Sequence, residues 1–180
     1  VRLPSEIGTY AQARASGHSP YIIAGITNNL IISAPVTLIT ILIAVPVAYS
    51  FGRFKFRQKT QLLLALGFSR TIPPIVTLIP YYIFFQALHL IGSVYSLIVI
   101  YLTLTIPLST WILFGYFSTL PKEIEYAGRL DGCTRLMVLR KIVAPMSYPA
   151  IVAIAVLMFL TSWNEIIFAL VITAGTPATT

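Results

Sequence analysis

Polar side chains that could contact a solute are few, and three of them are consecutive. Trp163, Asn164 and Glu165 interrupt one long apolar stretch, and Arg70 interrupts another. An indole ring can stack on a sugar face, while an amide and a carboxylate can bond its hydroxyl groups. A charge at the bilayer centre costs about 2.5–3.5 kcal/mol on insertion scales, which disfavours lipid-facing positions. We therefore predict that these four residues line a path across a membrane. The alternatives are that Arg70 extends to the inner interface and that Glu165 lies near water at the outer one.

Residues 120–145 form the most strongly charged stretch of the chain. Pro121 suits the first position of a helix, where a backbone N–H would have no partner. Glu123 and Glu125 would then lie at the positive end of the helix dipole. Gly132 can adopt the positive φ that ends such a helix. The pattern predicts a short helix that stops at this glycine.

A second short helix is predicted directly after the break. Either Asp131 or Thr134 can cap it, since both side chains accept hydrogen bonds from backbone N–H groups. Leu136, Leu139 and Val143 follow at i, i+3 and i+7 and would form one apolar stripe. Periodicity alone is also compatible with an amphipathic loop that lies on a membrane surface.

The sequence contains no recognisable catalytic or metal-binding pattern. No His, Cys and Asp cluster has metal-ligand spacing, and no nucleophile stands beside a base. None of the ten glycines is followed by lysine, so the phosphate-binding pattern G-x-x-x-x-G-K is missing. Cys133 is the single cysteine and cannot form an internal disulfide. We therefore expect this chain not to be an enzyme and to carry no metal and no cofactor.

Composition places the chain in a membrane. Hydrophobic residues make up 57% of it and charged residues 9%, whereas soluble domains carry about 25% charged residues. Lipid is the solvent that suits such a composition. The net charge of +7 does not indicate nucleic-acid binding, because the basic residues stand in short segments between apolar runs.

Four apolar stretches are long enough to cross a bilayer core of about 30 Å, which needs about 20 helical residues. They cover residues 28–51, 62–88, 93–116 and 142–172. Prolines inside these stretches predict kinked helices in a packed bundle. The expected fold is therefore an all-α, polytopic membrane helix bundle over residues 28–180, preceded by an extracytoplasmic leader segment over residues 1–27.

Basic residues predict the orientation of this bundle. Four lie between the first and second stretches, and five lie between the third and fourth, out of twelve in the chain. Positively charged loops face the cytoplasm. Two stretches separate these loops, so both can lie on the same side. The first stretch would then run inward and the fourth outward.

The charged stretch resembles the coupling loop of ABC importer permeases, whose pattern is E-A-A-x3-G-x9-I-x-L-P. Tyr126-Ala127-Gly128 stand at E-A-A, Gly132 follows after three residues, and Ile142-Val143-Ala144-Pro145 follow after nine more. The spacing is complete. Tyr126, Gly128 and Ala144 depart from the pattern.

Further segments resemble the carbohydrate-uptake, maltose-type branch of this binding-protein-dependent family. In that branch the loop begins with two acids and contains D-G, which Glu125 and the pair Asp131-Gly132 match. Glu125 could partly replace the acid that Tyr126 displaces. Arg70-Thr71-Ile72-Pro73-Pro74 resemble the second span of these permeases, and Trp163-Asn164-Glu165 resemble the span after the coupling loop.

The resemblance implies a permease subunit with the type I transmembrane fold, four of whose six spans lie in this chain. It implies a coupling loop over residues 117–142 that contacts an ATPase. The residues it assigns to coupling are Glu125, Tyr126, Ala127, Gly128, Asp131, Gly132 and Pro145.

The partners implied are a second homologous permease, two cytoplasmic ATPase subunits that hold ATP and Mg, an extracytoplasmic solute-binding protein and membrane lipid, but no nucleic acid. The location implied is the cytoplasmic (inner) membrane of a prokaryote. An importer of another solute, such as peptides or amino acids, and a secondary transporter or channel are the alternative interpretations.

Overall fold

The structure is a computed structural model that describes residues 20–69 and 71–173. Every regular element in these two ranges is helical, which confirms the all-α prediction. The elements are α2 (Pro20–Arg53), α3 (Lys59–Phe68), α4 (Pro74–Ala87), α5 (Val94–Thr119), α6 (Glu123–Leu130), α7 (Arg135–Val138), the π-helix η1 (Leu139–Val143), α8 (Ala144–Met146), α9 (Tyr148–Trp163) and α10 (Ile167–Thr173).

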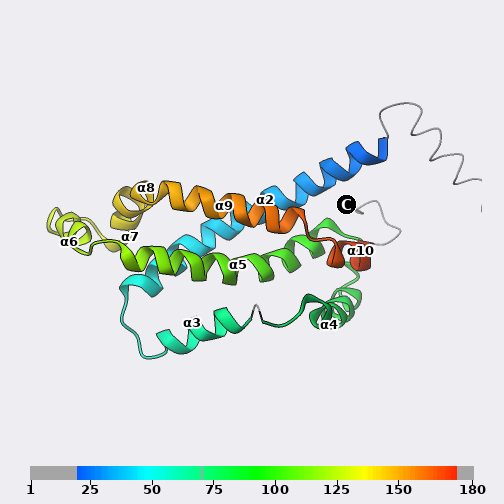
Figure 1. The fold of residues 1–180 in the computed structure, drawn as a ribbon, viewed down its shortest axis with the longest axis horizontal. Coiled ribbons are helices and arrows are strands. Elements are labelled where there is room, and N and C mark those ends of the chain that lie inside the picture. Colours follow the sequence, from blue (N-terminus) through cyan, green and yellow to red (C-terminus); the bar gives the residue numbers. More distant parts are fainter. Residues whose placement is uncertain (1–19, 70, 174–180) are drawn as a thin grey trace, which may run out of the picture.

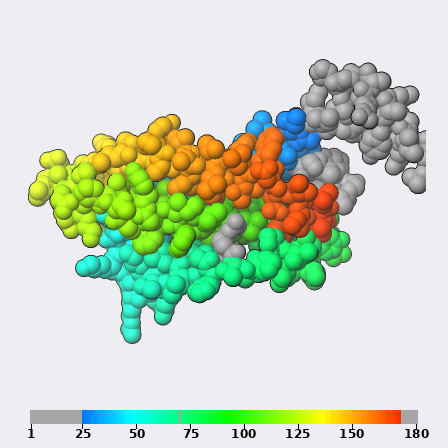
Figure 2. All heavy atoms as spheres, in the orientation of Figure 1, coloured from blue at the N-terminus to red at the C-terminus, as the bar shows by residue number. Residues whose placement is uncertain are grey.

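The chain runs back and forth along the long axis of the molecule (Figure 1). α2 is followed by α3 and α4 in the opposite direction, then by α5 and finally by α9. The α2–α3 connection and α6 lie at one end, here called the basic end, while α10 lies at the other. The space-filling view shows both basic segments on the surface at that end (Figure 2). The two basic loops therefore share one end, as their positions in the sequence require.

Among the described residues, two single helices are long and apolar enough to cross a membrane: the Gly25–Arg53 part of α2, and α5. The predicted stretch over residues 62–88 is not one helix, which corrects the sequence-based model. It consists of α3 and α4, with 10 and 14 residues. At 1.5 Å per residue they measure about 15 and 21 Å, so neither spans about 30 Å alone. Pro73 and Pro74 account for the break, because the residue before a proline is pushed away from helical geometry.

The predicted stretch over residues 142–172 also differs from a single helix. The segment Arg135–Met146 meets Tyr148–Trp163 at an angle of 79°, and the two together could form one broken span. Pro145 and Pro149 flank the bend at Ser147. η1 ends two residues before Pro145, whose missing N–H removes one α-helical hydrogen bond.

The first long helix begins earlier than the sequence predicts. α2 begins at Pro20, so residues 20–27, assigned to the leader from sequence, continue into the first long helix. Residues 1–19 lie outside the described residues. The extracytoplasmic placement of the leader stays a prediction.

α2 and α5 pack closely along much of their length. Ala44 and Ala48 of α2 are completely buried, and small residues let membrane helices approach each other. The Thr40 and Thr105 hydroxyls share a buried hydrogen bond of 2.7 Å. This pair of helices is the frame on which the other elements lie.

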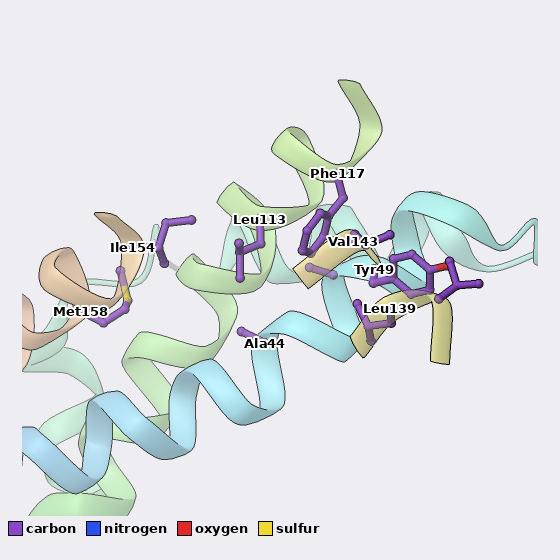
Figure 3. Packing of buried hydrophobic residues seen from close by; sticks show 10 residues of the cluster. Ala44, Tyr49, Leu113, Phe117, Leu139, Val143, Ile154 and Met158 are labelled. Carbon is purple, nitrogen blue, oxygen red and sulfur yellow. The ribbon is translucent and has the colours of Figure 1, made fainter. Parts of the chain in front are cut away.

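A core cluster at the basic end joins η1 to this frame. Tyr49 of α2, Phe117 of α5, and Leu139 and Val143 of η1 surround one apolar volume (Figure 3). A second cluster, around Phe168 of α10, packs at the opposite end. The segment after α6 is thus fixed to the inner surfaces of two long helices.

Candidate functional site at the basic end

α6 is a short helix stabilised by its charge distribution. Glu123 and Glu125 lie in its first turn and Arg129 in its last, and both placements complement the helix dipole. The N-cap residue is Lys122. Pro121 therefore precedes the helix instead of occupying its first position, which corrects that detail of the prediction. Within the predicted coupling loop over 117–142, residues 117–119 belong to the end of α5.

The end of α6 has the geometry that the sequence predicts. Gly132 adopts φ +84°. Its N–H donates to the Arg129 carbonyl at 3.1 Å, and the Cys133 N–H donates to the Gly128 carbonyl at 3.0 Å. This pair of bonds is the Schellman motif, which requires a left-handed residue at the position of Gly132.

Thr134 caps the second short helix, as one of the two predicted alternatives. Its hydroxyl accepts a hydrogen bond from the Met137 N–H at 3.4 Å. Asp131, the other candidate, is the C-cap of α6. The predicted apolar stripe is wrong at Leu136, which is 69% exposed. The π-turn that follows alters the helical register, and the buried face is made by Val138 and the two η1 residues of the basic-end core.

Gly128 lies where α6 contacts η1. It is buried, and a Cβ added there would overlap with Cδ1 of Ile142 and lie 3.6 Å from Cγ2 of Val138. The small residue at this position of the loop pattern therefore allows close contact between the two short helices. Ala127, its neighbour, is exposed.

Glu125 points into the protein and joins α6 to the end of α2. Its carboxylate forms an ion pair with Nε of Arg53 and accepts a hydrogen bond from the Tyr49 hydroxyl at 2.9 Å. Arg53 also donates from Nη2 to the Leu120 carbonyl at 3.0 Å. The Arg53 and Glu125 side chains are 5% and 12% exposed. Glu125 is therefore engaged inside the chain.

The other face of α6 presents apolar side chains to the outside. Tyr126 is 58% exposed and Leu130 is 89% exposed. Figure 2 shows this segment at the extreme basic end of the molecule. Exposed apolar side chains on a projecting helix are typical of a surface that another protein covers.

Pro145 lies apart from α6, in the short helix α8 after η1, and is exposed. Asp131 is also exposed, at the turn that ends α6. The structure therefore separates the predicted coupling residues into three groups. Glu125 and Gly128 hold α6 to the bundle, Tyr126 and Ala127 face outward, and Asp131, Gly132 and Pro145 shape the backbone.

The predicted path residues lie at the opposite end of the bundle, at the junction of α9 and α10 (Figure 1). Trp163 ends α9, and the Asn164 amide donates to the Leu160 carbonyl at 2.8 Å. The Glu165 carbonyl accepts from the Tyr101 hydroxyl at 2.8 Å. Oε1 of Glu165 is buried and has no hydrogen-bond partner among the described residues.

Arg70, the fourth predicted path residue, lies outside the described residues, so its placement relative to the other three stays a prediction. Within the described ranges, no three His, Cys, Asp or Glu side chains are grouped as metal ligands.

Sequence reasoning missed two residues of the site. Tyr49 and Arg53 belong to α2, and only Arg53 had a signal, as one of the basic residues that predict orientation. Their contact with Glu125 joins distant parts of the chain and depends on how α2, α5 and η1 pack. No spacing pattern in the sequence predicts this contact.

The apolar α2–α5 frame and the broken helices indicate an integral membrane protein, from which α6 projects at the basic end. Residues 40–180 match the family described as binding-protein-dependent transport system inner membrane component. The chain belongs to this family.

Two relatives and one solved structure illustrate the similarity. The trehalose/maltose transport system permease protein MalG of Thermococcus litoralis is 36% identical over 159 residues, which cover 87% of this chain and 56% of that protein. The sulfoquinovosyl glycerol transport system permease protein SmoH of Agrobacterium fabrum is 32% identical over 143 residues, covering 79% and 50%. The chain thus spans about half the length of these relatives.

A crystal structure of a bacterial ABC transporter involved in the import of the acidic polysaccharide alginate contains a similar chain. The TM-score is 0.76 at 20% identity, over 90% of this chain and 56% of that one. This likeness confirms the predicted permease fold.

Proposed function

We propose that this chain is part of the permease subunit of an ATP-driven importer that carries a sugar or oligosaccharide across the cytoplasmic membrane of a prokaryote. Family membership supports the transport role. The names of two relatives, which transport trehalose or maltose and sulfoquinovosyl glycerol, support a carbohydrate cargo.

The projecting helix α6 is the observation that carries the proposal. It ends sharply at Gly132, packs through Gly128 against η1, and exposes Tyr126 and Leu130 at the basic end. In this role α6 inserts into a cleft of a cytoplasmic ATPase subunit. Movement of the ATPase pair would then shift α6 as a rigid body.

Two sets of contacts would carry that movement into the bundle. The Glu125–Arg53 ion pair and the Tyr49 hydrogen bond lead directly to α2. The buried side chains of η1 lead to the core between α2, α5 and α9. Because packed helices shift as units rather than deform continuously, a small displacement of α6 suffices to bias one arrangement of the bundle over another.

The complete importer would contain a second homologous permease, two ATPase subunits and an extracytoplasmic solute-binding protein. ATP and Mg would bind to the ATPase subunits and not to this chain. The basic end would face the cytoplasm, in line with the positive-inside rule. The junction of α9 and α10 would then lie toward the outer side.

Trp163, Asn164 and Glu165 are the proposed cargo contacts. Glu165→Ala and Asn164→Ala should raise the KM for uptake several-fold, while ATP hydrolysis by the assembled importer stays near the wild-type rate. Glu165 should have the larger effect, because its carboxylate oxygen is unpaired among the described residues whereas the Asn164 amide already caps α9. Unchanged uptake kinetics in both variants would remove these residues from the path.

Reconstitution tests the function as a whole. Proteoliposomes that contain both permeases, the ATPase pair and the binding protein should accumulate radiolabelled sugar only with ATP inside. Accumulation without any ATPase subunit would favour a secondary transporter. ATP-dependent uptake of peptides or amino acids, with no sugar uptake, would favour an importer of another solute.

A further inference from the structure

A polar cavity of about 120 Å³ lies between the end of α2, α6 and α7. Its wall contains four basic side chains and one carboxylate. The charged residues in the wall are Arg53, Lys122, Glu125, Arg129 and Arg135. The cavity therefore carries a strong excess of positive charge.

The single carboxylate balances only one of these cations and leaves Lys122, Arg129 and Arg135 without a counter-charge in the wall. Glu125 is paired with Arg53 and Tyr49. The Arg53 side chain is only 5% exposed. Its Nη1 is buried and has no hydrogen-bond partner among the described residues. Arg135 lies 4.7 Å from the centre of the Phe54 ring, a contact that leaves its charge in place.

Lys122 and Arg129 complete the uncompensated set. No ion pair among residues 20–69 and 71–173 includes either side chain. Like charges that converge on a partly enclosed space repel each other. An anion with several acceptor oxygens relieves this repulsion and forms charge-assisted hydrogen bonds with the guanidinium groups.

We propose that this cavity receives the carboxylate of an Asp or Glu side chain of the partner ATPase. The inference rests on the proposed function. Tyr126 belongs both to the cavity wall and to the exposed apolar face of α6. A protein that covers this face therefore lies beside the cavity mouth and can insert a side chain into it. A volume of about 120 Å³ accommodates a carboxyl group with its adjoining methylene.

Zero-length crosslinking of the assembled importer tests the contact. A carbodiimide condenses a lysine amine with a carboxylate that touches it, with loss of water and formation of an amide bond. We expect mass spectrometry to find Lys122 joined to an acidic residue of the ATPase. Lys122→Arg keeps the charge but removes the amine, and should abolish that crosslink. Lys55, exposed at the same end but outside the cavity wall, should not form one.

Charge reversal tests the energetics. Arg129→Glu and Arg135→Glu should each weaken ATPase binding by about tenfold or more, with a reduced dependence on salt concentration. Arg57→Glu is the matched control, because Arg57 is exposed at the basic end and does not line the cavity. Its ATPase affinity should stay within about twofold of wild type, as for charges outside a contact.

Two results would overturn the proposal. One is normal ATPase binding by both cavity variants together with no crosslink from Lys122. The other is that both cavity variants bind the ATPase normally but no longer co-purify with anionic phospholipid, which would assign the cavity to a lipid headgroup. A wild-type importer whose permease binds no ATPase at all would contradict the proposed function itself, so the two failures are distinguishable.

Discussion

Adjacent residues of α6 have opposite surroundings. Glu125 is bound inside the protein, whereas Tyr126 is largely exposed. Successive side chains on a helix differ by about 100° in direction, so neighbours in sequence can face different partners. The residue at the acidic position of the loop pattern therefore faces outward, and the matching acid beside it has a role within the chain.

The ion pair between Arg53 and Glu125 should be needed for both stability and coupling. Glu125→Ala leaves a buried guanidinium without its anion, which typically costs about 3–5 kcal/mol. We expect a lower Tm for the importer and a higher ratio of ATP hydrolysed to solute imported.

The double variant Arg53→Leu/Glu125→Leu separates these effects. Without a lone buried charge it should recover most of the lost stability, because a hydrophobic pair often replaces a buried ion pair at little cost. Coupling should stay impaired, since the polar contact to α2 is gone. A Glu125→Ala variant with wild-type Tm and coupling would contradict this assignment.

Gly132 is required for its backbone conformation and not for its small size. A Cβ at this position meets no heavy atom within 4 Å, but φ is +84°. Gly132→Val should therefore strain the turn, by about 1–2 kcal/mol or more for a β-branched residue. Gly132→Asn should have a much smaller effect, because asparagine tolerates the left-handed region.

Co-purification of the ATPase with the permease, together with the uptake rate, measures the difference. We expect Gly132→Val to lower both ATPase co-purification and the uptake rate several-fold, and Gly132→Asn to leave both near the wild-type values. Equal losses for the two variants would show that side-chain bulk at this surface matters more than backbone strain.

At the level of elements, the contact between α6 and η1 depends on the absence of a large side chain at position 128. Gly128→Ala should be tolerated, since only the flexible end of Ile142 has to move. Gly128→Leu should push the two short helices apart and reduce ATPase binding about tenfold or more, the typical order for loss of packing at an interface core.

A second substitution checks that the cause is steric. In Gly128→Leu/Ile142→Ala the space freed at η1 accepts the new side chain, so ATPase binding should partly recover. Failure of Ile142→Ala to improve binding in that background would count against the close contact as the reason.

Elements were predictable from sequence to different degrees. The long helices α2 and α5 follow from uninterrupted apolar runs. The division of residues 62–88 into two helices does not follow from hydropathy, because α3 and α4 are both apolar and only Pro73 and Pro74 mark the break. The π-helix η1 was not predicted, because it depends on the packing of Leu139 and Val143 against α2 and α5 as well as on the nearby Pro145.

The secondary structure of the site was predictable from the sequence, but the directions in which its side chains point were not. The spacing of the charged stretch correctly indicated a short helix, its stop at Gly132 and a second capped helix, with Thr134 as one of two candidate caps. The inward orientation of Glu125 depends on Tyr49 and Arg53, which approach only after α2 and α5 pack together. The basic cavity is likewise a product of tertiary structure.

At the scale of the whole molecule, the two ends have different chemistry. The basic end carries α6, the ion pair to α2 and the cationic cavity. The opposite end carries the junction of α9 and α10, with a buried carboxylate oxygen that has no partner in the described part of the chain. α2, α5 and α9 connect the two ends, so displacement of α6 has a rigid route to the proposed cargo contacts.

The central claim is that α6 contacts an ATPase from the cytoplasmic side, and site-specific crosslinking tests it most directly. Leu130→Cys, in a Cys133→Ser background, places the one thiol of this sequence at a position of α6 where the native side chain is 89% exposed. A reagent with a maleimide at one end, which adds to this thiol, and a photoactivated benzophenone at the other, which inserts into a nearby C–H bond, should then join the permease to the ATPase subunit in membranes. Labelling of Leu130→Cys from outside intact cells, or crosslinks that never reach an ATP-hydrolysing subunit, would contradict the account.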